Sequence, residues 1–224
     1  MNSKEKITFI VNWIKNYTKS IKSQPVSLVI GVSGGVDSAL TSTLCAHSGL
    51  KTIAISMPIK QNSSQHELSL RHLDFLKKNF DNVDCKIIEL DNIFKTFEST
   101  MKDFDSELAF ANSRSRLRMV TLYQVAQSHN GIVVGTGNKV EDFGVGFYTK
   151  YGDGGVDIAP IADLYKTEVW ELGEYLEVDQ RIVDAEPTDG LWSDSRTDES
   201  QLGASYAELE EAMETGTGPG VEVL

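Results

Sequence analysis

The chain has 224 residues, enough for one domain with a full hydrophobic core. Its 40% hydrophobic and 24% charged residues are ordinary for a soluble globular protein. A net charge of −12 argues against a nucleic-acid-binding surface, which needs a basic face, and no apolar run is long enough to span a membrane. Cys45 and Cys85 give neither a disulfide framework nor a metal-ligand spacing, and no signal-peptide core follows Met1, so we expect a cytoplasmic protein.

The first 135 residues alternate between amphipathic and apolar segments. Apolar residues at helical spacing predict a helix over residues 4–22, ending before Pro25. Apolar runs predict four strands, at Ser27–Val32, Lys51–Met57, Val83–Leu90 and Gly131–Gly135. The segments between them predict helices at Ser38–His47, Ser64–Phe80, Asn92–Met101 and Glu107–His129. This alternation predicts an α/β fold, a single doubly wound domain whose mostly parallel sheet has helices on both faces.

The remaining residues are less regular. Helices are predicted at Asp163–Leu176 and Ser205–Glu214. We expect the glycine-rich segment 143–160 and the polar segment 185–203 to be lids that close over a substrate. The domain then spans residues 1–214, and residues 215–224 are expected to be a disordered tail.

The most informative segment is the octet Gly31–Ser38, which follows a predicted strand and precedes a predicted helix. Backbone N–H groups at a helix N-terminus favour phosphate, and the glycines let a ligand approach the backbone closely. The hydroxyls of Ser33 and Ser38 can donate to phosphate oxygens. A carboxylate at Asp37 fits this anion site if it holds a hard cation such as Mg²⁺ against the phosphates.

Other interpretations of the octet are weaker. A Walker-type loop is excluded because no lysine stands where that motif requires one. The first five residues also match the G-x-S-x-G nucleophile elbow, with Ser33 as nucleophile, but no histidine follows His129 to serve as its base. A serine hydrolase stays a remote alternative, and a glycine-serine turn without a ligand is another.

The segment Ser33–Ser38 resembles the S-G-G-x-D-S loop of the ATP pyrophosphatases, which cleave ATP between its α and β phosphates and form adenylates. Further segments resemble the NAD synthetase family within that superfamily, and Phe147–Asp157 is the most specific of them. The others are Asn112–Met119, Gly135–Lys139 with Glu141, Leu164–Lys166 and Pro187–Trp192. The resemblance runs from about residue 5 to about residue 213 and implies an adenine nucleotide alpha hydrolase-like fold.

The resemblance implies an ammonia-dependent NAD synthetase. Such a ligase adenylates the nicotinate carboxylate of deamido-NAD with ATP, releases pyrophosphate, and lets ammonia displace AMP to give NAD. The alternatives are another amidoligase of the ATP pyrophosphatase type, or a nucleotide-binding module without turnover.

The resemblance also assigns site residues. Those expected to bind ATP are Gly31, Val32, Ser33, Gly34, Gly35, Val36, Asp37, Ser38, Thr136, Lys166 and Thr188. Those expected to bind deamido-NAD are Arg116, Lys150 and Asp157, and those expected to hold Mg²⁺ are Asp37 and Glu141. No residue is assigned as a general acid or base. Arg114 and Arg118 share a helix face that Arg116 does not, and we interpret both as ion-paired surface residues.

The expected partners are small molecules, namely ATP, deamido-NAD and ammonia. The resemblance implies a homodimer with the dinucleotide site near the subunit interface, to which the helix with Trp13 and the helix at 107–129 could contribute apolar surface. Only 30 residues precede Gly31, so we expect no glutaminase domain, while a separate glutaminase stays possible. The family's C-terminal His-Lys pair, which touches deamido-NAD, has no counterpart, because no lysine or histidine follows Lys166.

Overall fold

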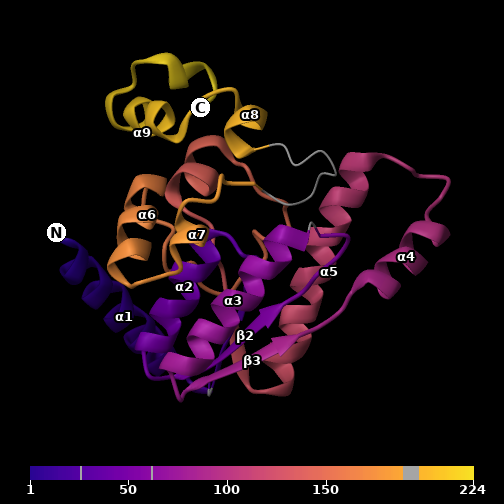
Figure 1. Cartoon of the computed structure of the whole chain (residues 1–224), viewed down its shortest axis with the longest axis horizontal. Helices are drawn as coiled ribbons and strands as arrows, with labels where there is room; N and C mark the ends of the chain where they lie inside the picture. The colour runs from indigo at the N-terminus through magenta and orange to yellow at the C-terminus, as the bar shows by residue number, and fades with distance from the viewer. Residues whose placement is uncertain (26, 62, 189–196) are drawn as a thin grey trace.

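The structure is a computed structural model that describes residues 1–25, 27–61, 63–188 and 197–224 (Figure 1). A four-stranded parallel sheet has the order β3-β2-β1-β4. Its strands are β1 (Ser27–Gly31), β2 (Lys51–Ser56), β3 (Val83–Ile87) and β4 (Gly131–Val134). In the register, Ile30 of β1 pairs with Ala54 of β2 and with Val134 of β4. The predicted parallel α/β architecture is confirmed.

Helices cover both faces of the sheet, because the inner strand β1 carries apolar side chains on both faces. Leu28 and Ile30 of β1 join the core beneath α1 (Ser3–Ser20), α2 (Val36–His47), α3 (Ser63–Asn79) and α6 (Lys166–Tyr175). Val29 points the other way and joins a second core with α4 (Asp91–Thr100) and α5 (Glu107–Ser128). Burial on both faces explains why β1 is a continuous apolar run rather than an alternating one.

The strand order determines where a ligand-binding crevice opens in the sheet. The chain leaves β1 through α2 toward β2 on one side, and it returns through α5 to β4 on the other side of β1. Connections that diverge in this way open a crevice at the carboxyl ends of the two strands, where open α/β sheets bind ligands. The octet that follows β1 and the segment 135–141 that follows β4 therefore meet at this crevice.

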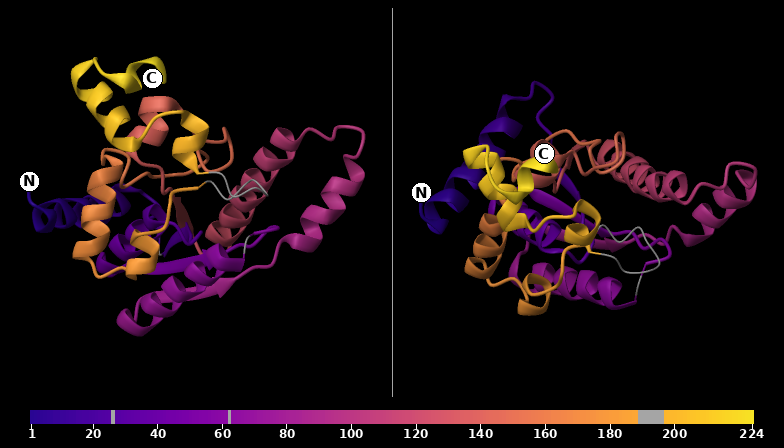
Figure 2. Two further views of the ribbon diagram at one scale, coloured as in Figure 1. Left: turned by 45° about the horizontal axis from the view of Figure 1, so that its top comes forward. Right: turned by 90° about the horizontal axis from the view of Figure 1, so that it is seen from above.

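The last residues build a small layer of their own. Here α8 (Asp198–Leu202) and α9 (Tyr206–Thr215) lie together on one side of the molecule (Figures 1 and 2). Their core, formed by Val140, Ala204, Tyr206 and Leu209, includes a residue of the π-helix η1 (Val140–Val145). The C-terminal layer is thus anchored on the segment that follows β4.

Several elements differ from the predictions. Residues 215–224, expected to be a disordered tail, include the 3-10 helix η2 (Pro219–Glu222), whose Gly220 is buried against α9. The helix expected from Asp163 begins at Lys166, since Leu164 N–H donates to Ile161 in a turn just before it. The strand expected to reach Leu90 ends at Ile87, and the short α7 (Gln180–Val183) was not predicted.

The helices α4 and α5 form an arm that extends from the body of the molecule (Figures 1 and 2). Large apolar side chains are exposed along it, namely Ile93, Phe97, Phe104, Leu108 and Val120. Across the described part of the chain, no helix combines the length and the apolar character needed to cross a membrane.

Candidate active site

The octet after β1 folds into a compact turn that only glycine permits at one position. Gly34 has a φ of +99°, and a Cβ there would lie 2.5 Å from the backbone oxygen of Gln65 in α3. Ser38 Oγ accepts from Ser33 N–H (3.2 Å) and donates to the Gly35 oxygen (2.9 Å), which closes the turn. Because Gly35 caps α2 without a side-chain hydrogen bond, the first N–H groups of α2 can serve an anion.

A buried lysine joins the two predicted metal ligands beside this turn. Lys166 Nζ lies 2.6 Å from Asp37 Oδ2 and 2.9 Å from Glu141 Oε1. Lys166 is 2% exposed, whereas the side chains of Asp37 and Glu141 are 17% and 16% exposed, so the carboxylates present the accessible part of the group. Burial opposes the charge of Lys166, but the attraction of both carboxylates outweighs it and raises its pKa.

Two further residues fix the carboxylates. Asn138 Nδ2 donates to Asp37 Oδ1 (2.9 Å), while Asn138 Oδ1 accepts from the N–H groups of Val140 and Glu141. The buried Tyr206 hydroxyl donates to Glu141 Oε1 (2.7 Å) and lies 3.3 Å from an oxygen of Asp198. Burial and these carboxylates raise the pKa of Tyr206. Asn138 was predicted only as part of a motif, and Tyr206 was not predicted, because it lies 65 residues from Glu141.

The octet lines one cavity of about 760 Å³ together with Glu141 and Lys166. A cavity of this size falls within the range of small-molecule sites. All the residues expected to bind ATP or Mg²⁺ line it, including Thr136 from the β4 side and Thr188. The quoted segment Pro187–Trp192 continues beyond Thr188 outside the described residues, as does part of the expected lid at 185–203.

The residues expected to bind deamido-NAD do not line this cavity. Arg116 is exposed on α5, and its Nε donates to the backbone oxygen of Lys150 (3.1 Å), so these two residues lie together. Asp157 accepts from Val133 N–H (2.7 Å) and from the Tyr123 hydroxyl (3.1 Å). Arg116 and Lys150 therefore lie together, whereas Asp157 contacts α5 at a different place, at Tyr123.

The interpretation of Arg118 as an ion-paired surface residue was wrong. Arg118 lines the cavity, and its Nε donates to the backbone oxygen of Met57 (3.1 Å), just beyond the end of β2. Within the described part of the chain, no salt bridge involves Arg118. Its neighbour Arg114 lies on the same helix face, with its guanidinium carbon 5.6 Å from the centre of the Phe94 ring.

The geometry gives no support to a serine hydrolase. All four histidines lie in the described part of the chain, and no hydrogen bond joins any of them to Ser33. His72 is buried against Ser42, and His129 lies at the end of α5 near the Val125 oxygen. Ser33 Oγ instead accepts from Gly35 N–H and lies 3.2 Å from Ser38 Oγ.

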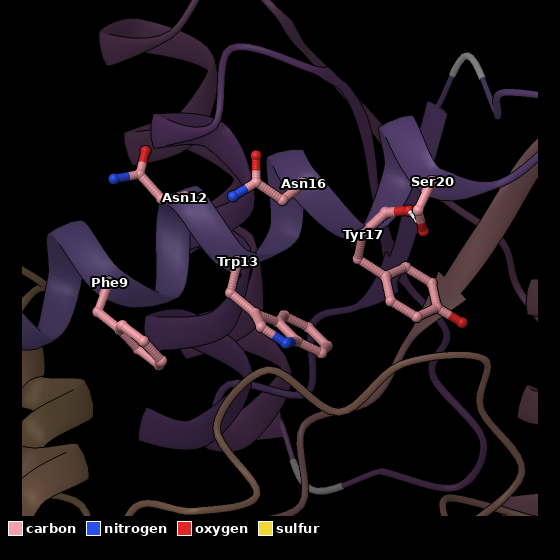
Figure 3. A pocket seen from close by; sticks show the side chains of 6 residues that line it. All are labelled: Phe9, Asn12, Trp13, Asn16, Tyr17 and Ser20. Carbon is pink, nitrogen blue, oxygen red and sulfur yellow. Dashed lines mark hydrogen bonds between the residues drawn. The ribbon is translucent and has the colours of Figure 1, made fainter.

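A second, smaller cavity of about 390 Å³ lies along α1 (Figure 3). Phe9, Trp13 and Tyr17 extend from one side of the helix, and the rings of Trp13 and Tyr17 stack with centroids 5.5 Å apart. Asn12, Asn16 and Ser20 complete its lining, which has no charged side chain. It lacks the cations and the helix N-terminus that distinguish the first cavity as an anion site.

The turn at the end of β1, with acidic, basic and amide side chains beside it, is typical of an α/β enzyme of the ATP pyrophosphatase class. The family model "NAD synthase" matches residues 6–220. The chain belongs to the NAD synthase family.

Individual relatives agree with this assignment. An NH3-dependent NAD(+) synthetase from Carboxydothermus hydrogenoformans is 37% identical over 97% of this chain and 88% of its own length. The structure of an NMN synthetase from Francisella tularensis has a TM-score of 0.89 and 33% identity, covering 100% of this chain and 90% of the other. An NH3-dependent NAD synthetase from Campylobacter jejuni has a TM-score of 0.77 and 29% identity, covering 100% and 89%.

Proposed function

We propose that the cavity of about 760 Å³ binds ATP with its phosphates on the octet and activates a nicotinate carboxylate for amidation by ammonia. The observation that supports this most is the joining of Asp37, Lys166 and Glu141 beside a helix N-terminus in a member of the NAD synthase family. Phosphoryl-transfer sites need such preorganised charge at the phosphates.

In the first half-reaction, a carboxylate oxygen of deamido-NAD attacks the α-phosphorus of ATP. The bond from that phosphorus to the oxygen bridging to the β-phosphate breaks, and pyrophosphate leaves. The N–H groups at the start of α2 and the Ser33 hydroxyl would hold the leaving phosphates, and Lys166 would supply positive charge nearby. The Ser38 hydroxyl donates to the Gly35 oxygen, so it would have to turn away from that oxygen to reach a phosphate.

In the second half-reaction, ammonia attacks the carbonyl carbon of the acyl adenylate. The carbon–oxygen bond to AMP breaks, and loss of a proton from nitrogen leaves the amide. No side chain is assigned as a base. The residues around the cavity would exclude water, which would otherwise hydrolyse the adenylate.

The residues fit a divalent cation. In the described residues no group of three or more His, Cys, Asp and Glu side chains could hold a metal alone. Mg²⁺ is usually held by one or two carboxylates together with substrate phosphates, and Asp37 and Glu141 provide two. When bound there, Mg²⁺ would supply positive charge to the phosphate oxygens. Lys166 Nζ now contacts both carboxylates, so it would have to give up part of these contacts.

For the acid substrate, we propose that Arg116, Lys150 and Asp157 contact deamido-NAD outside the ATP cavity. Arg116 and Asp157 both lie along α5, at two places outside the lining of the ATP cavity, which supports this because a dinucleotide is longer than the reacting centre. A mononucleotide acid is the second candidate, favoured by the TM-score of 0.89 to the NMN synthetase.

One assay separates these possibilities. Purified protein is given ATP, Mg²⁺ and ammonia with either deamido-NAD or nicotinate mononucleotide, and the amide product and AMP are measured together. A higher kcat/KM for the dinucleotide supports the proposal, and a higher value for the mononucleotide supports the alternative.

The metal assignment is tested with Asp37→Ala. Failure of Asp37→Ala to reduce Mg²⁺-dependent adenylation would contradict the metal assignment.

We also propose a homodimer that works in the cytoplasm on free ammonia. The exposed apolar side chains of the α4–α5 arm support a second copy as partner, since Phe104 is 71% and Leu108 is 58% exposed. A cytoplasmic location agrees with Cys45 and Cys85, which are both free thiols.

A further inference from the structure

Arg118 is a partly buried cation that forms no salt bridge with any carboxylate in the described part of the chain. It comes from α5, on the face of the sheet opposite to α2 and α6, and lines the same cavity as Lys166. Lys166 is balanced by two carboxylates within 3 Å, whereas Arg118 forms no salt bridge in the described part of the chain. The two cations therefore differ in the negative charge around them.

The surroundings of Arg118 add to the cost of its charge. Burial, followed by repulsion from Arg114, lowers the pKa of Arg118 to about 10, which still leaves it cationic at neutral pH. Asp153 provides only a weaker attraction, and its carboxylate already accepts from the Ser115 hydroxyl (2.6 Å) and from Thr149 N–H (3.0 Å). A charge in an enclosed, partly desolvated site is costly without a salt-bridge partner, and an anionic ligand would offset that cost.

The backbone holds Arg118 in a defined orientation. Its Nε donates to the Met57 oxygen, and Met57 in turn packs against Gly31 at the start of the octet, where a Cβ would lie 3.3 Å from the Met57 terminal methyl. One of the five guanidinium N–H donors is therefore used for positioning, and Arg118, which carries the other four, lines the cavity.

We infer that Arg118 is a substrate-binding residue whose guanidinium binds an oxyanion at the reacting centre. This inference rests on the proposed function, in which two oxyanions meet in the cavity: the α-phosphoryl group of ATP and the carboxylate that attacks it. An arginine fork suits either group, because both offer two oxygens for paired hydrogen bonds.

The test compares Arg118→Gln and Arg118→Lys with the unmodified protein. Steady-state rates are measured with ATP and deamido-NAD varied separately, and calorimetry measures the Kd of each substrate alone. We expect kcat/KM to fall about 100-fold or more in Arg118→Gln, as for the loss of a charged hydrogen bond in an enclosed site. Arg118→Lys keeps the charge but loses the fork, so it should be intermediate.

The substrate whose Kd or KM rises identifies the bound oxyanion. A rise for ATP alone indicates the α-phosphoryl group, and a rise for deamido-NAD alone indicates the carboxylate. Arg71→Gln removes one positive charge from an exposed i,i+4 pair with Glu67 and serves as the matched control, with unchanged kinetics expected. Thermal unfolding of every variant separates loss of binding from loss of folding.

Unchanged kcat and KM for both substrates in a folded Arg118→Gln would overturn the inference. If Arg118→Gln does not fold, Arg118→Lys decides alone, and unchanged kinetics in that variant would be equally fatal. If the unmodified protein shows no amidation, the proposed function fails first. Arg118 is then judged by the two calorimetric Kd values, and equal values in protein and variant would reject its role.

Discussion

Lys166, at the start of α6, reaches Asp37 in the first turn of α2 with 2.6 Å between Nζ and Oδ2, although 129 residues separate them in the chain. The same Nζ contacts Glu141. One ammonium group therefore joins the start of α6 to the segment that follows β1 and to the segment that follows β4. The contact connects the phosphate-binding turn to the C-terminal layer, because Tyr206 of α9 bonds to the same Glu141 oxygen. We therefore expect a ligand that changes the contacts of Asp37 or Glu141 to affect the packing of that layer.

Replacing Lys166 with methionine should destabilise the fold and reduce catalysis. The substitution leaves two adjacent carboxylates without their shared cation. Breaking a buried ion pair in this way lowers the free energy of unfolding by about 3 kcal/mol. For a chain of this size the midpoint of thermal unfolding should fall by roughly 10 °C. Mg²⁺ should raise the midpoint of the variant more than that of the unmodified protein, because Nζ no longer contacts the carboxylate oxygens.

The control for this change is Lys6→Met, which removes a surface pair with Glu168 and should alter stability by less than about 1 kcal/mol. Differential scanning calorimetry with and without Mg²⁺ measures both variants. An equal effect of Mg²⁺ on Lys166→Met and on the unmodified protein would show that the lysine and the ion do not share these oxygens.

Replacing Tyr206 with phenylalanine should lower stability while keeping the packing of the ring. The ring would still lie edge-on to Trp170, but Glu141 and Asp198 would lose the hydroxyl between them. A buried acceptor that loses its donor costs about 1–3 kcal/mol. Urea unfolding measures this loss, and Tyr175→Phe on the exposed side of α6 is the control. Equal stability of the two variants would mean that the hydroxyl contributes nothing.

The sequence allowed the sheet and the turn to be predicted because their signals are local. β1 and β4 are buried on both faces and read as apolar runs, and Gly34 lies in a short motif between a strand and a helix. A backbone turn built from adjacent residues needs no distant partner to form. For this reason the strands and the octet could be predicted from the sequence, whereas the binding of ATP by the octet stays a prediction.

The remaining features depend on partners far away in the chain. Arg118 is one of three arginines in five positions of a helix, a pattern typical of a solvated face, yet Met57 holds it from 61 residues away. Tyr206 belongs to a short acidic helix with no motif of its own. Their roles arise from tertiary packing, and no local period or propensity encodes such contacts.

The proposed dimer predicts which apolar surface is covered. Phe104→Glu would place a charge on the most exposed aromatic side chain of the α4–α5 arm and should convert the dimer to monomer. Phe9→Glu changes the aromatic row of α1 instead and should leave the dimer intact (Figure 3). Size-exclusion chromatography with light scattering measures both masses. The opposite pattern would assign the interface to α1, and a monomeric unmodified protein would reject the dimer.

Replacing Gly34 with alanine should displace α3 from the phosphate-binding turn. The new Cβ would meet the backbone oxygen of Gln65 at 2.5 Å, in addition to the strain of a φ of +99°. Gly49→Ala is a matched control, because its φ of +71° brings similar strain without any atom within 4 Å. The control should lose about 1 kcal/mol. Gly34→Ala should lose more and should also weaken ATP binding, and a Kd for ATP equal to that of the control would contradict the assignment of the turn.

Stability should fall below pH 6.5 because of His72. Burial lowers the pKa of His72 from 6.5 to about 4, and its neighbours Ser42 and Phe75 carry no charge. Between these values the unfolded chain binds a proton that the folded chain does not, so acidification favours unfolding. The contribution of His72 to the free energy of unfolding is fully present above pH 6.5 and declines toward pH 4, by an amount on the order of 3 kcal/mol.

Asp142 has the opposite effect on stability, because burial and nearby carboxylates raise its pKa to about 6. The test is therefore the difference between the unmodified protein and His72→Gln in urea unfolding at several pH values. That difference should shrink as the pH falls from 7 to 4, and a constant difference would show that His72 does not titrate between the two states.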